Sequence, residues 1–378
     1  MSQSNDFSRR HFLQLTGGVA LTTLVGCNTK HDLLTSTQNG HWAPYNDSVV
    51  IDGLCGLFDA NAKELDSKTL TLFRQSGLDA INATSAYPGD DFDAANKKLD
   101  ASLQIINKYS DYLQLITAWD AILAAKTAQK LGIIWGFQST EMFGDKLENI
   151  THFANRGVRY MQMSYNGPSQ YGDGGLVKEN RGLTTLGQAA LGVMEANKVL
   201  VDLSHSGQRT VAESIALASQ PMTISHTGCN SIYQHPRNND DAELKAVANK
   251  GGVVGIYLMP FLEGGDGEIT ADVLLRHLEH AINVCGEDHV SIGSDQGVVP
   301  VNDGPEYPEM VRKDVERRMV AGISAPGETP NRPPFIPELN SVRRMELIAW
   351  YMHRNGYSDG VIEKVMGRNL LNLYQIVW

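Results

Sequence analysis

Val199-Leu-Val-Asp-Leu-Ser-His205 is a short apolar run that ends on a histidine, and two later segments have the same form. Met222-Thr-Ile-Ser-His226 also ends on a histidine, and His289-Val-Ser-Ile-Gly-Ser-Asp295 ends on an aspartate. Such runs are typical of buried parallel strands. The carboxyl ends of the strands in a (β/α)8 barrel meet at one mouth, so these three end residues are predicted to share a pocket.

The rest of the chain alternates strand-like and helix-like segments, which favours parallel βα units. The predicted barrel strands are 49–53, 78–83, 132–138, 158–163, 199–204, 222–225, 252–258 and 289–294. A ninth run, 113–117, is interpreted as an accessory strand. We therefore predict an α/β fold, a TIM-like (β/α)8 barrel with a long loop after strand 8 and helices at the C-terminus.

Helix signals lie between the predicted strands. Asp120 is expected to cap a helix over 121–131, and Asp240 or Asp241 a helix over 242–250. Residues 271–285 are amphipathic, and the tail is expected to close the fold with one or two helices. Prolines cluster between Pro300 and Pro337, in the long loop, which is interpreted as a lid or a partner-docking surface over the mouth, with a solvated insertion as the alternative.

Length and charge limit the classes of function. The 378 residues are enough for one barrel of about 250 residues with insertions. The chain has 32 basic and 43 acidic residues and a net charge of −11. No basic stripe stands out, so a nucleic-acid partner is not expected.

The N-terminus is interpreted as a targeting segment. Ser8-Arg9-Arg10-His11-Phe12-Leu13 resembles the twin-arginine export signal, and Leu24-Val25-Gly26-Cys27 resembles a bacterial lipobox. The intervening apolar stretch is too short to span a bilayer, so the membrane is expected to be reached only through a lipid on Cys27. A plain soluble signal or a cytoplasmic tail is the alternative.

These segments divide the chain into three parts. We expect a signal with a lipobox over 1–27, a polar tether over 28–47 and a barrel domain over 48–378. The expected location is the periplasm, with a lipid anchor.

The three strand-end residues suit metal-assisted hydrolysis. Imidazole nitrogens and carboxylate oxygens are ligands that zinc prefers, and a bound metal ion activates water and polarises a carbonyl group. His205 and His226 are candidate metal ligands, and Asp295 is a candidate ligand or general base. Taken singly, each has an ordinary interpretation as a hydrogen-bonded structural histidine or a turn-capping aspartate.

Several motifs in this order resemble those of the renal (membrane) dipeptidase family. They are Val201-Asp-Leu-Ser-His205, Ser225-His226, His235-Pro-Arg-Asn238 followed by Asp240, Lys250-Gly-Gly-Val-Val-Gly255, His289-Val-Ser-Ile-Gly-Ser-Asp295, Gly157-Val-Arg-Tyr160 and Gly367-Arg-Asn-Leu370. The resemblance covers about 49–376. It implies a zinc peptidase on a TIM-like barrel that hydrolyses dipeptides, and it leaves a homodimer open.

The resemblance also implies a role for each matched residue. His205 and His226 match two histidines that bind one of two zinc ions. Asp295 matches the acid that handles the proton and contacts the substrate amine. Arg237 matches the arginine that pairs with the terminal carboxylate, a group that a guanidinium binds with two parallel hydrogen bonds.

The sequence departs from the family at the other zinc ion. The family's first strand ends Asp-Gly-His-Asn-Asp, whereas this chain has Asp52-Gly-Leu-Cys-Gly56, without either ligand. Gln138 stands in place of a bridging glutamate, and Tyr165 in place of a substrate-binding histidine. We expect both of these residues to contact substrate instead, Tyr165 by donating a hydrogen bond to an oxyanion.

Three alternatives follow for the site. One zinc ion binds to His205 and His226, helped by Cys55, Gln138 or Asp295; or no metal binds and the pocket performs other chemistry or only binds a ligand; or the barrel is a structural or partner-binding protein. The leading prediction is a dipeptidase-type hydrolase with an altered or single-metal site. A Cys55–Cys229 disulfide is left open, because both residues follow strand ends in an oxidising compartment.

Overall fold

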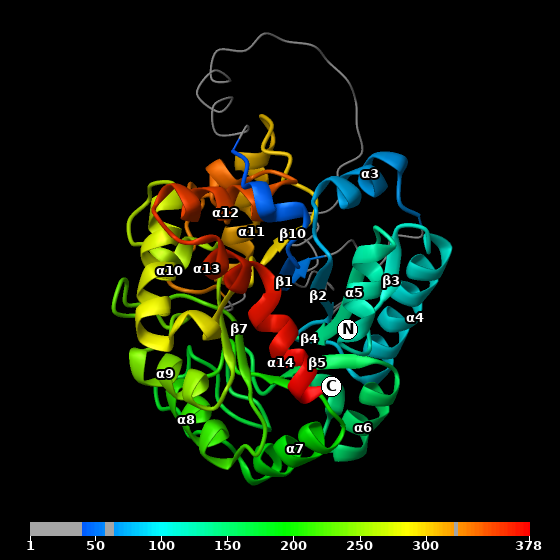
Figure 1. Cartoon of the computed structure of the whole chain (residues 1–378). Helices are drawn as coiled ribbons and strands as arrows, with labels where there is room; N and C mark the ends of the chain where they lie inside the picture. The colour runs from blue at the N-terminus through cyan, green and yellow to red at the C-terminus, as the bar shows by residue number, and fades with distance from the viewer. Residues whose placement is uncertain (1–39, 57–63, 321–323) are drawn as a thin grey trace.

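The strands form one parallel sheet that closes on itself (Figure 1). The computed structural model describes residues 40–56, 64–320 and 324–378. Its strands are β1 (Ile51–Gly56), β2 (Ala80–Ala86), β3 (Leu113–Leu115), β4 (Leu131–Phe137), β5 (Val158–Gln162), β6 (Leu200–Asp202), β7 (Thr223–Thr227), β8 (Val253–Ile256), β9 (Val290–Ile292) and β10 (Gln296–Gly297). The order runs from β10 through β1 to β9, and β10 follows β9 almost directly, so the last strand returns to the first.

The predicted TIM-like barrel is confirmed. Each predicted barrel strand has a counterpart, and the pairings between these strands are parallel. The accessory run is β3, which pairs with β4 outside the barrel path. Closure comes from β10, where Gln296 pairs with Cys55 of β1. This closure brings the end of the last strand against the end of the first.

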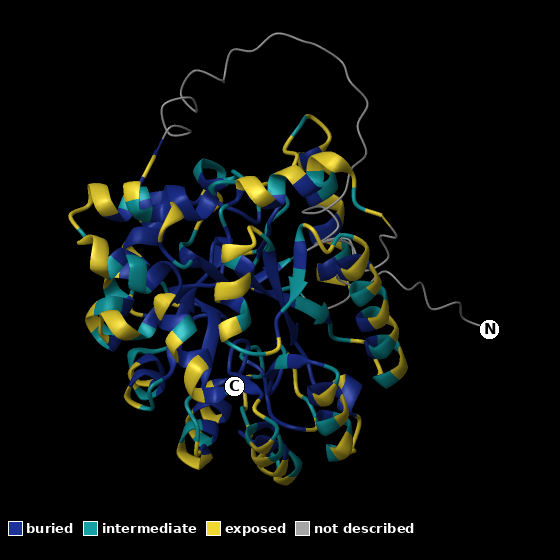
Figure 2. Ribbon diagram, turned by 45° about the vertical axis from the view of Figure 1, so that its right-hand side comes forward, coloured by how far each residue is buried: buried dark blue, intermediate teal, exposed yellow. Residues whose placement is uncertain are grey.

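Helices surround the sheet, with buried residues inward and exposed residues outward (Figure 2). They are α3 (Ser67–Gln75), α4 (Phe92–Lys108), α5 (Asp120–Thr127), α6 (Leu147–Asn155), α7 (Thr185–Ala196), α8 (Gln208–Leu217), α9 (Asp241–Asn249), α10 (Ala271–Cys285), α11 (Tyr307–Val320), α12 (Arg344–Arg354), α13 (Asp359–Glu363) and α14 (Asn369–Val377). Within the described ranges, none is long and apolar enough to cross a bilayer.

The helix starts follow local chemistry. Asp240 caps α9, and its backbone N–H donates to Glu243 Oε2 at 3.0 Å, which forms a capping box. The predicted cap at Asp120 is wrong, because α5 begins at Asp120 itself and Trp119 takes the cap position without a side-chain hydrogen bond. An acidic residue in the first turn still suits the positive end of the helix dipole.

The floor of the barrel is closed by the C-terminal helices, as predicted. Leu370, Leu373 and Tyr374 of α14 pack against inward residues of β1, β5 and other strands. The hydroxyl groups of Tyr160 and Tyr374 lie 2.5 Å apart in this buried layer. Because these side chains fill one end of the barrel, a ligand is expected to enter at the other end, where the strands have their carboxyl ends.

The N-terminal boundary differs from the predicted one. Trp42 and Tyr45 are buried in the core, and Trp42 Nε1 donates to Asp359 of α13 at 2.7 Å. The end of the predicted tether over 28–47 is therefore part of the packed domain. The predicted signal, the lipobox and the rest of the tether lie outside the described residues.

Candidate active site

One cavity at the mouth brings together most of the predicted site residues. It is lined by Gln138, Asn166, His205, Arg237, Met259, Phe261, Asp295, Arg318, Ala325 and Glu328. His226 lies behind His205, and Tyr165 stacks on the His205 ring with a centroid separation of 4.0 Å. The cavity volume is about 30 Å³, enough for about two water molecules. The structure thus places His205, Asp295 and Arg237 around one cavity, whereas His226 contacts His205 without lining that cavity. The roles of these residues stay predictions.

His205 and His226 form a close imidazole pair. Their Nε2 atoms are 2.9 Å apart, and both side chains are buried. His205 Nδ1 lies 2.7 Å from the Oδ1 atom of Asn166. An amide oxygen only accepts, so Nδ1 of His205 is the donor and its Nε2 presents a lone pair in the neutral ring. His226 Nδ1 lies 2.8 Å from Ser225 Oγ.

This arrangement fits one cation. When both Nδ1 atoms donate, two Nε2 lone pairs face each other at 2.9 Å, and they repel unless a proton lies between them or a metal ion binds to both. Ligating histidines typically donate their other ring N–H to an oxygen, as His205 does to Asn166. The two imidazoles therefore fit as part of the ligand set of one metal ion.

The first strand adds no ligand to this pair. Leu54 is buried and apolar, and Cys55 Sγ donates to the carbonyl of Gly56 at 3.2 Å. Burial raises the pKa of the Cys55 thiol well above its ordinary value, which opposes thiolate formation. Among the described residues, no three His, Cys, Asp or Glu side chains form a group that could hold a metal ion. The structure thus does not bring Cys55 to the histidines.

The three cysteines among the described residues are all unpaired thiols. Cys55, Cys229 and Cys285 are buried and free in the structure. Cys229 Sγ donates to the carbonyl of His277 at 3.5 Å. The open alternative of a Cys55–Cys229 disulfide is therefore not what the fold adopts.

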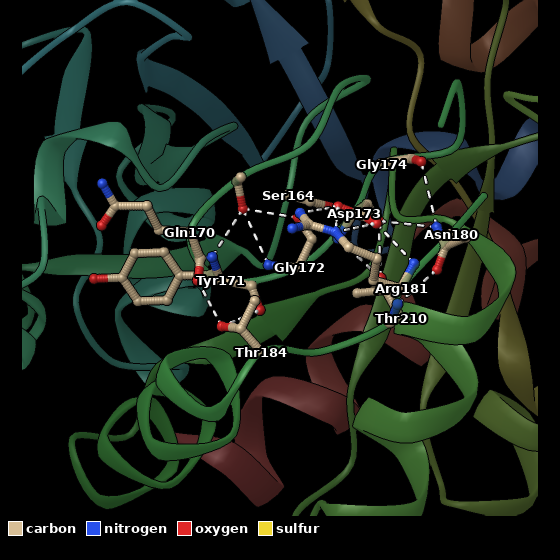
Figure 3. A network of polar contacts seen from close by, with 12 residues as sticks. Ser164, Gln170, Tyr171, Gly172, Asp173, Gly174, Asn180, Arg181, Thr184 and Thr210 are labelled. Carbon is tan, nitrogen blue, oxygen red and sulfur yellow. Dashed lines mark hydrogen bonds and ion pairs between the residues drawn. The ribbon is translucent and has the colours of Figure 1, made fainter. Parts of the chain in front are cut away.

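The loop after β5 is fixed by hydrogen bonds and holds Tyr165 and Asn166 against His205. Figure 3 shows the Asp173 side chain meeting Arg181, whose Nε donates to Asp173 Oδ2 at 2.9 Å and whose backbone N–H donates to the same oxygen at 2.7 Å. Ser164, at the start of the loop, lies 3.0 Å from Ser206 through the two hydroxyl groups. The loop is thus fixed at both ends beside the imidazole pair.

Arg237 presents a buried cation to the cavity. It is only 4% exposed, and its Nη2 atom has no hydrogen-bond partner. Burial lowers its pKa, while the nearby Tyr257 and the charges of Asp295 and Asp202 raise it. A buried guanidinium with an unsatisfied N–H donor costs the folded protein free energy unless a ligand accepts that hydrogen bond. This geometry suits the carboxylate-binding role that the sequence implies.

Two site residues have left-handed backbone conformations. His205 has φ of 66° and Asp295 has φ of 55°, values that non-glycine residues rarely adopt. Such strain persists only where surrounding contacts impose it, and it is common at functional sites. The backbone N–H of Asp295 donates to the carbonyl of Leu54 at 2.9 Å, so the joint between the last and first strands holds this residue.

The long connection after β9 and β10 covers the mouth. Arg318 of α11 forms a two-point ion pair with Glu328, with both distances at 2.7 Å, and both residues line the cavity. His235 Nε2 donates to the carbonyl of Pro326 at 2.6 Å. Burial lowers the pKa of His235 to about 4, so this imidazole is neutral near pH 7. The described parts of the connection therefore pack over the cavity rather than forming a solvated insertion.

Sequence reasoning missed several contributors to the site. Asn166, Arg318 and Glu328 line the cavity, and Asp52 and Asp202 support it from beneath. The sequence did contain one sign of Asp52 and Asp202. Each candidate strand-end residue directly follows a serine, and a buried serine needs a hydrogen-bond partner. No local pattern marks Arg318 and Glu328, which meet across a long connection.

Comparison with known proteins agrees with this geometry. Residues 34–324 match the family model described as membrane dipeptidase. This chain belongs to the membrane dipeptidase family. An uncharacterized dipeptidase of Schizosaccharomyces pombe is 28% identical over 58% of this chain and 56% of its own length. A protein of Klebsiella pneumoniae encoded in the pqqA 5′ region is 24% identical over 78% of this chain and 99% of its own.

Solved structures show the same fold as this membrane dipeptidase family member. An amidohydrolase from Pseudomonas aeruginosa has a TM-score of 0.76 and 28% identity, covering 89% of this chain and 98% of its own. A metallo peptidase from Rhodobacter sphaeroides, liganded with a phosphinate mimic of L-Ala-D-Ala, has a TM-score of 0.71 and 18% identity, covering 88% and 100%. At the latter identity, the likeness concerns the fold alone.

Proposed function

We propose that the protein is a hydrolase of dipeptides or dipeptide-like amides that works with a single metal ion, zinc being the expected element. The observation that supports this most is the imidazole pair, whose Nε2 atoms face each other at 2.9 Å beside a cavity lined by Arg237 and Asp295. A metal ion held there would activate water and polarise the scissile carbonyl. Membership of the membrane dipeptidase family supports the reaction class.

The chain's own groups have distinct roles in this proposal. Arg237 binds the terminal carboxylate with its remaining buried donor. Asp295 takes a proton from the attacking water and returns it to the leaving amine. Gln138 contacts the substrate from the cavity wall, and Tyr165 contacts it from beside the His205 ring. Since the cavity holds only about two water molecules, a dipeptide enters only when the cover formed by Arg318 and Glu328 moves.

A second candidate function is binding without turnover. It is favoured by the uncharged residues that stand near the histidines in place of metal ligands. Gln138, in place of a bridging carboxylate, donates its Nε2 to Thr84 Oγ1 at 2.7 Å, and Leu54 is buried. In this alternative the protein holds a peptide-like ligand through Arg237 and releases it unchanged.

We also propose export through the twin-arginine route to the periplasm, with a lipid anchor on Cys27. Support comes from the sequence motifs alone. Fractionation of cells that express the full chain or Cys27→Ser tests this assignment. Equal membrane association of the two forms would remove the anchor from the proposal.

Elemental analysis and a dipeptide panel separate the two functions. The full chain should purify with about one equivalent of zinc, below the usual two of a paired centre, and hydrolyse some dipeptides. His205→Ala should lose both metal and activity. His353→Ala, which changes an exposed histidine on α12, is the matched control and should lose neither.

Other outcomes have clear meanings. Metal-free protein that cleaves no dipeptide rejects the hydrolase. Thermal stabilisation by dipeptides that disappears in Arg237→Met would then favour the binding function. If Arg237→Met is stabilised by dipeptides as strongly as the natural chain, the carboxylate role assigned to Arg237 is wrong.

A further inference from the structure

A buried serine directly precedes each strand-end residue of the site. The pairs are Ser204-His205, Ser225-His226 and Ser294-Asp295. Two buried aspartates bind these serines from beneath: Asp202 accepts from the first two, and Asp52 from the third. The serines therefore connect the functional side chains to carboxyl groups that do not line the cavity.

Asp202 replaces backbone pairing where two strands separate. Strands β6 and β7 pair at Asp202 and Thr223. Beyond that point, Asp202 Oδ1 accepts the backbone N–H of Ser204 at 3.0 Å and that of Ser225 at 2.9 Å. Its Oδ2 accepts the Ser225 hydroxyl at 2.6 Å and Gln162 Nε2 at 3.1 Å. One side chain thus fixes the residues that precede both histidines.

The proton on Ser225 Oγ determines the tautomer of His226. A hydroxyl has one proton to donate and two lone pairs. Ser225 donates its proton to Asp202 Oδ2. Its contact with His226 Nδ1 at 2.8 Å then requires the ring to donate, so Nδ1 carries the hydrogen and Nε2 is left with its lone pair. Ser204 Oγ, 3.1 Å from Ser225 Oγ, fills the remaining acceptor position.

We propose that Asp202 is a positioning residue that sets the tautomer of His226 through Ser225, so that the Nε2 lone pair faces His205. The relay prepares the imidazole pair to bind a cation. The link to metal binding rests on the proposed function, whereas the tautomer itself does not. Asp202 acts only through Ser225 and Ser204, since it does not line the cavity.

Asp202→Asn tests the relay with little change in shape. The Asn Oδ1 still accepts the two backbone N–H groups, but its NH2 group stands where Oδ2 stood and accepts nothing. Ser225 therefore loses its acceptor and turns its hydroxyl proton towards His226 Nδ1. The tautomer should reverse and place the hydrogen on Nε2, which blocks cation binding between the rings. Asp52→Asn is the matched control, because Asp52 contacts Ser294 rather than Ser225.

The readout is the ring nitrogen chemical shifts of 15N-histidine-labelled, metal-free full chain at about pH 8, where neutral imidazoles dominate. His226, assigned with His226→Gln, should show a protonated Nδ1 in the natural chain and in Asp52→Asn, and an Nδ1 without hydrogen in Asp202→Asn. A natural chain whose His226 Nδ1 carries no hydrogen, or a folded Asp202→Asn with an unchanged pattern, overturns the proposal.

A second measurement separates this inference from the proposed function. Zinc affinity, measured by competition with a chelator, should fall on the order of 10- to 100-fold in Asp202→Asn and stay unchanged in Asp52→Asn. If the tautomer reverses but the natural chain binds no zinc, the relay stands and the metal-dependent function fails. If zinc binds equally to both variants, the assigned purpose of the relay is wrong.

Discussion

Asp52 offers a quantitative test of how the site is held. Its Oδ1 accepts the backbone N–H of Ser294 at 2.8 Å, and its Oδ2 accepts the Ser294 hydroxyl at 2.5 Å. Burial nevertheless raises its pKa to about 6 from an ordinary 3.8, because the hydrogen bonds from Ser294 and the charge of Arg344 offset only part of the desolvation. At 1.4 kcal/mol per pKa unit, the ionised side chain costs the folded state about 3 kcal/mol above pH 7.

The pH dependence follows from the sign of this change. A carboxyl group with a raised pKa in the folded protein favours folding at low pH, and this contribution is lost as the pH rises through about 6. Asp52→Asn removes the titration, since Asn Oδ1 still accepts from Ser294 N–H and its amide donates to the Ser294 hydroxyl. The variant should therefore be about 3 kcal/mol more stable than the natural chain at pH 7.5, but only about 1 kcal/mol more stable at pH 4.5.

Urea unfolding of the metal-free protein at the two pH values measures this difference. The pKa of Asp52, followed by the 13C shift of its carboxyl carbon, is an independent check. A stability difference that is equal at both pH values, or that grows on acidification, would refute the reasoning. The latter result would mean that the hydrogen bonds outweigh burial and lower the pKa.

Three further changes test the energetics of the mouth and the floor. Arg237→Met should raise the unfolding free energy of the unliganded protein by about 1 kcal/mol or more, because it removes a buried charge with an unsatisfied donor; a less stable variant in urea contradicts this. A double-mutant cycle of Arg318→Gln and Glu328→Gln should give a coupling of about 1–3 kcal/mol for a pair only 6% and 13% exposed; a coupling near zero would mean that the cover is held by other contacts. Tyr160→Phe should cost about 1–3 kcal/mol by leaving the Tyr374 hydroxyl without its partner in the barrel floor; a change below that of the half-exposed control Tyr351→Phe opposes it.

The barrel was predictable because the hydrophobic pattern of each segment and the residues that bound it indicate the same structure along most of the chain. Runs such as 252–258 are short, apolar and bounded by glycine, so strand is the consistent interpretation, and β8 lies within that run. Asp240 could be predicted as a cap because its partner Glu243 lies three residues later, whereas Asp120 has no such partner and falls inside α5. Trp42 could not be predicted as core, because residues far away in the sequence, such as Asp359 of α13, contact it.

The site was predictable where residues lie at strand ends and not where they meet across loops. His205 and Asp295 converge because barrel strands point to one mouth, whereas Arg237, in the loop after β7, was assigned only through the family resemblance. Asn166 reaches His205 only because the loop after β5 folds back onto it, a feature that no local pattern encodes. The absence of the family's two first-strand ligands was visible in the sequence at Leu54 and Gly56, and the structure does not offset it with Cys55.

The changes at the first strand and at Gln138 are physically linked. The resemblance to membrane dipeptidases assigns a histidine to position 54, an aspartate to position 56 and a bridging glutamate to position 138. Any of these carboxylates left buried without its cation would be an unpaired charge that costs several kcal/mol. This chain has neutral residues at all three, and the Gln138 amide is instead satisfied by Thr84. In the proposed single-metal site, the absence of the second ion would account for these three changes together.

We expect that the second metal site can be restored only when all three of its ligands are introduced together. The triple variant Leu54→His, Gly56→Asp, Gln138→Glu should bind about one more equivalent of zinc than the natural chain, and its stability should rise steeply when zinc is added. Gln138→Glu alone should bind no additional metal, and in metal-free protein it should be less stable at neutral pH than the natural chain, because its carboxylate is then buried near Asp295 without a metal ion. Elemental analysis and melting curves with and without a chelator measure both effects. A triple variant that gains no metal would show that the first strand, and not its ligands alone, has moved away from the site.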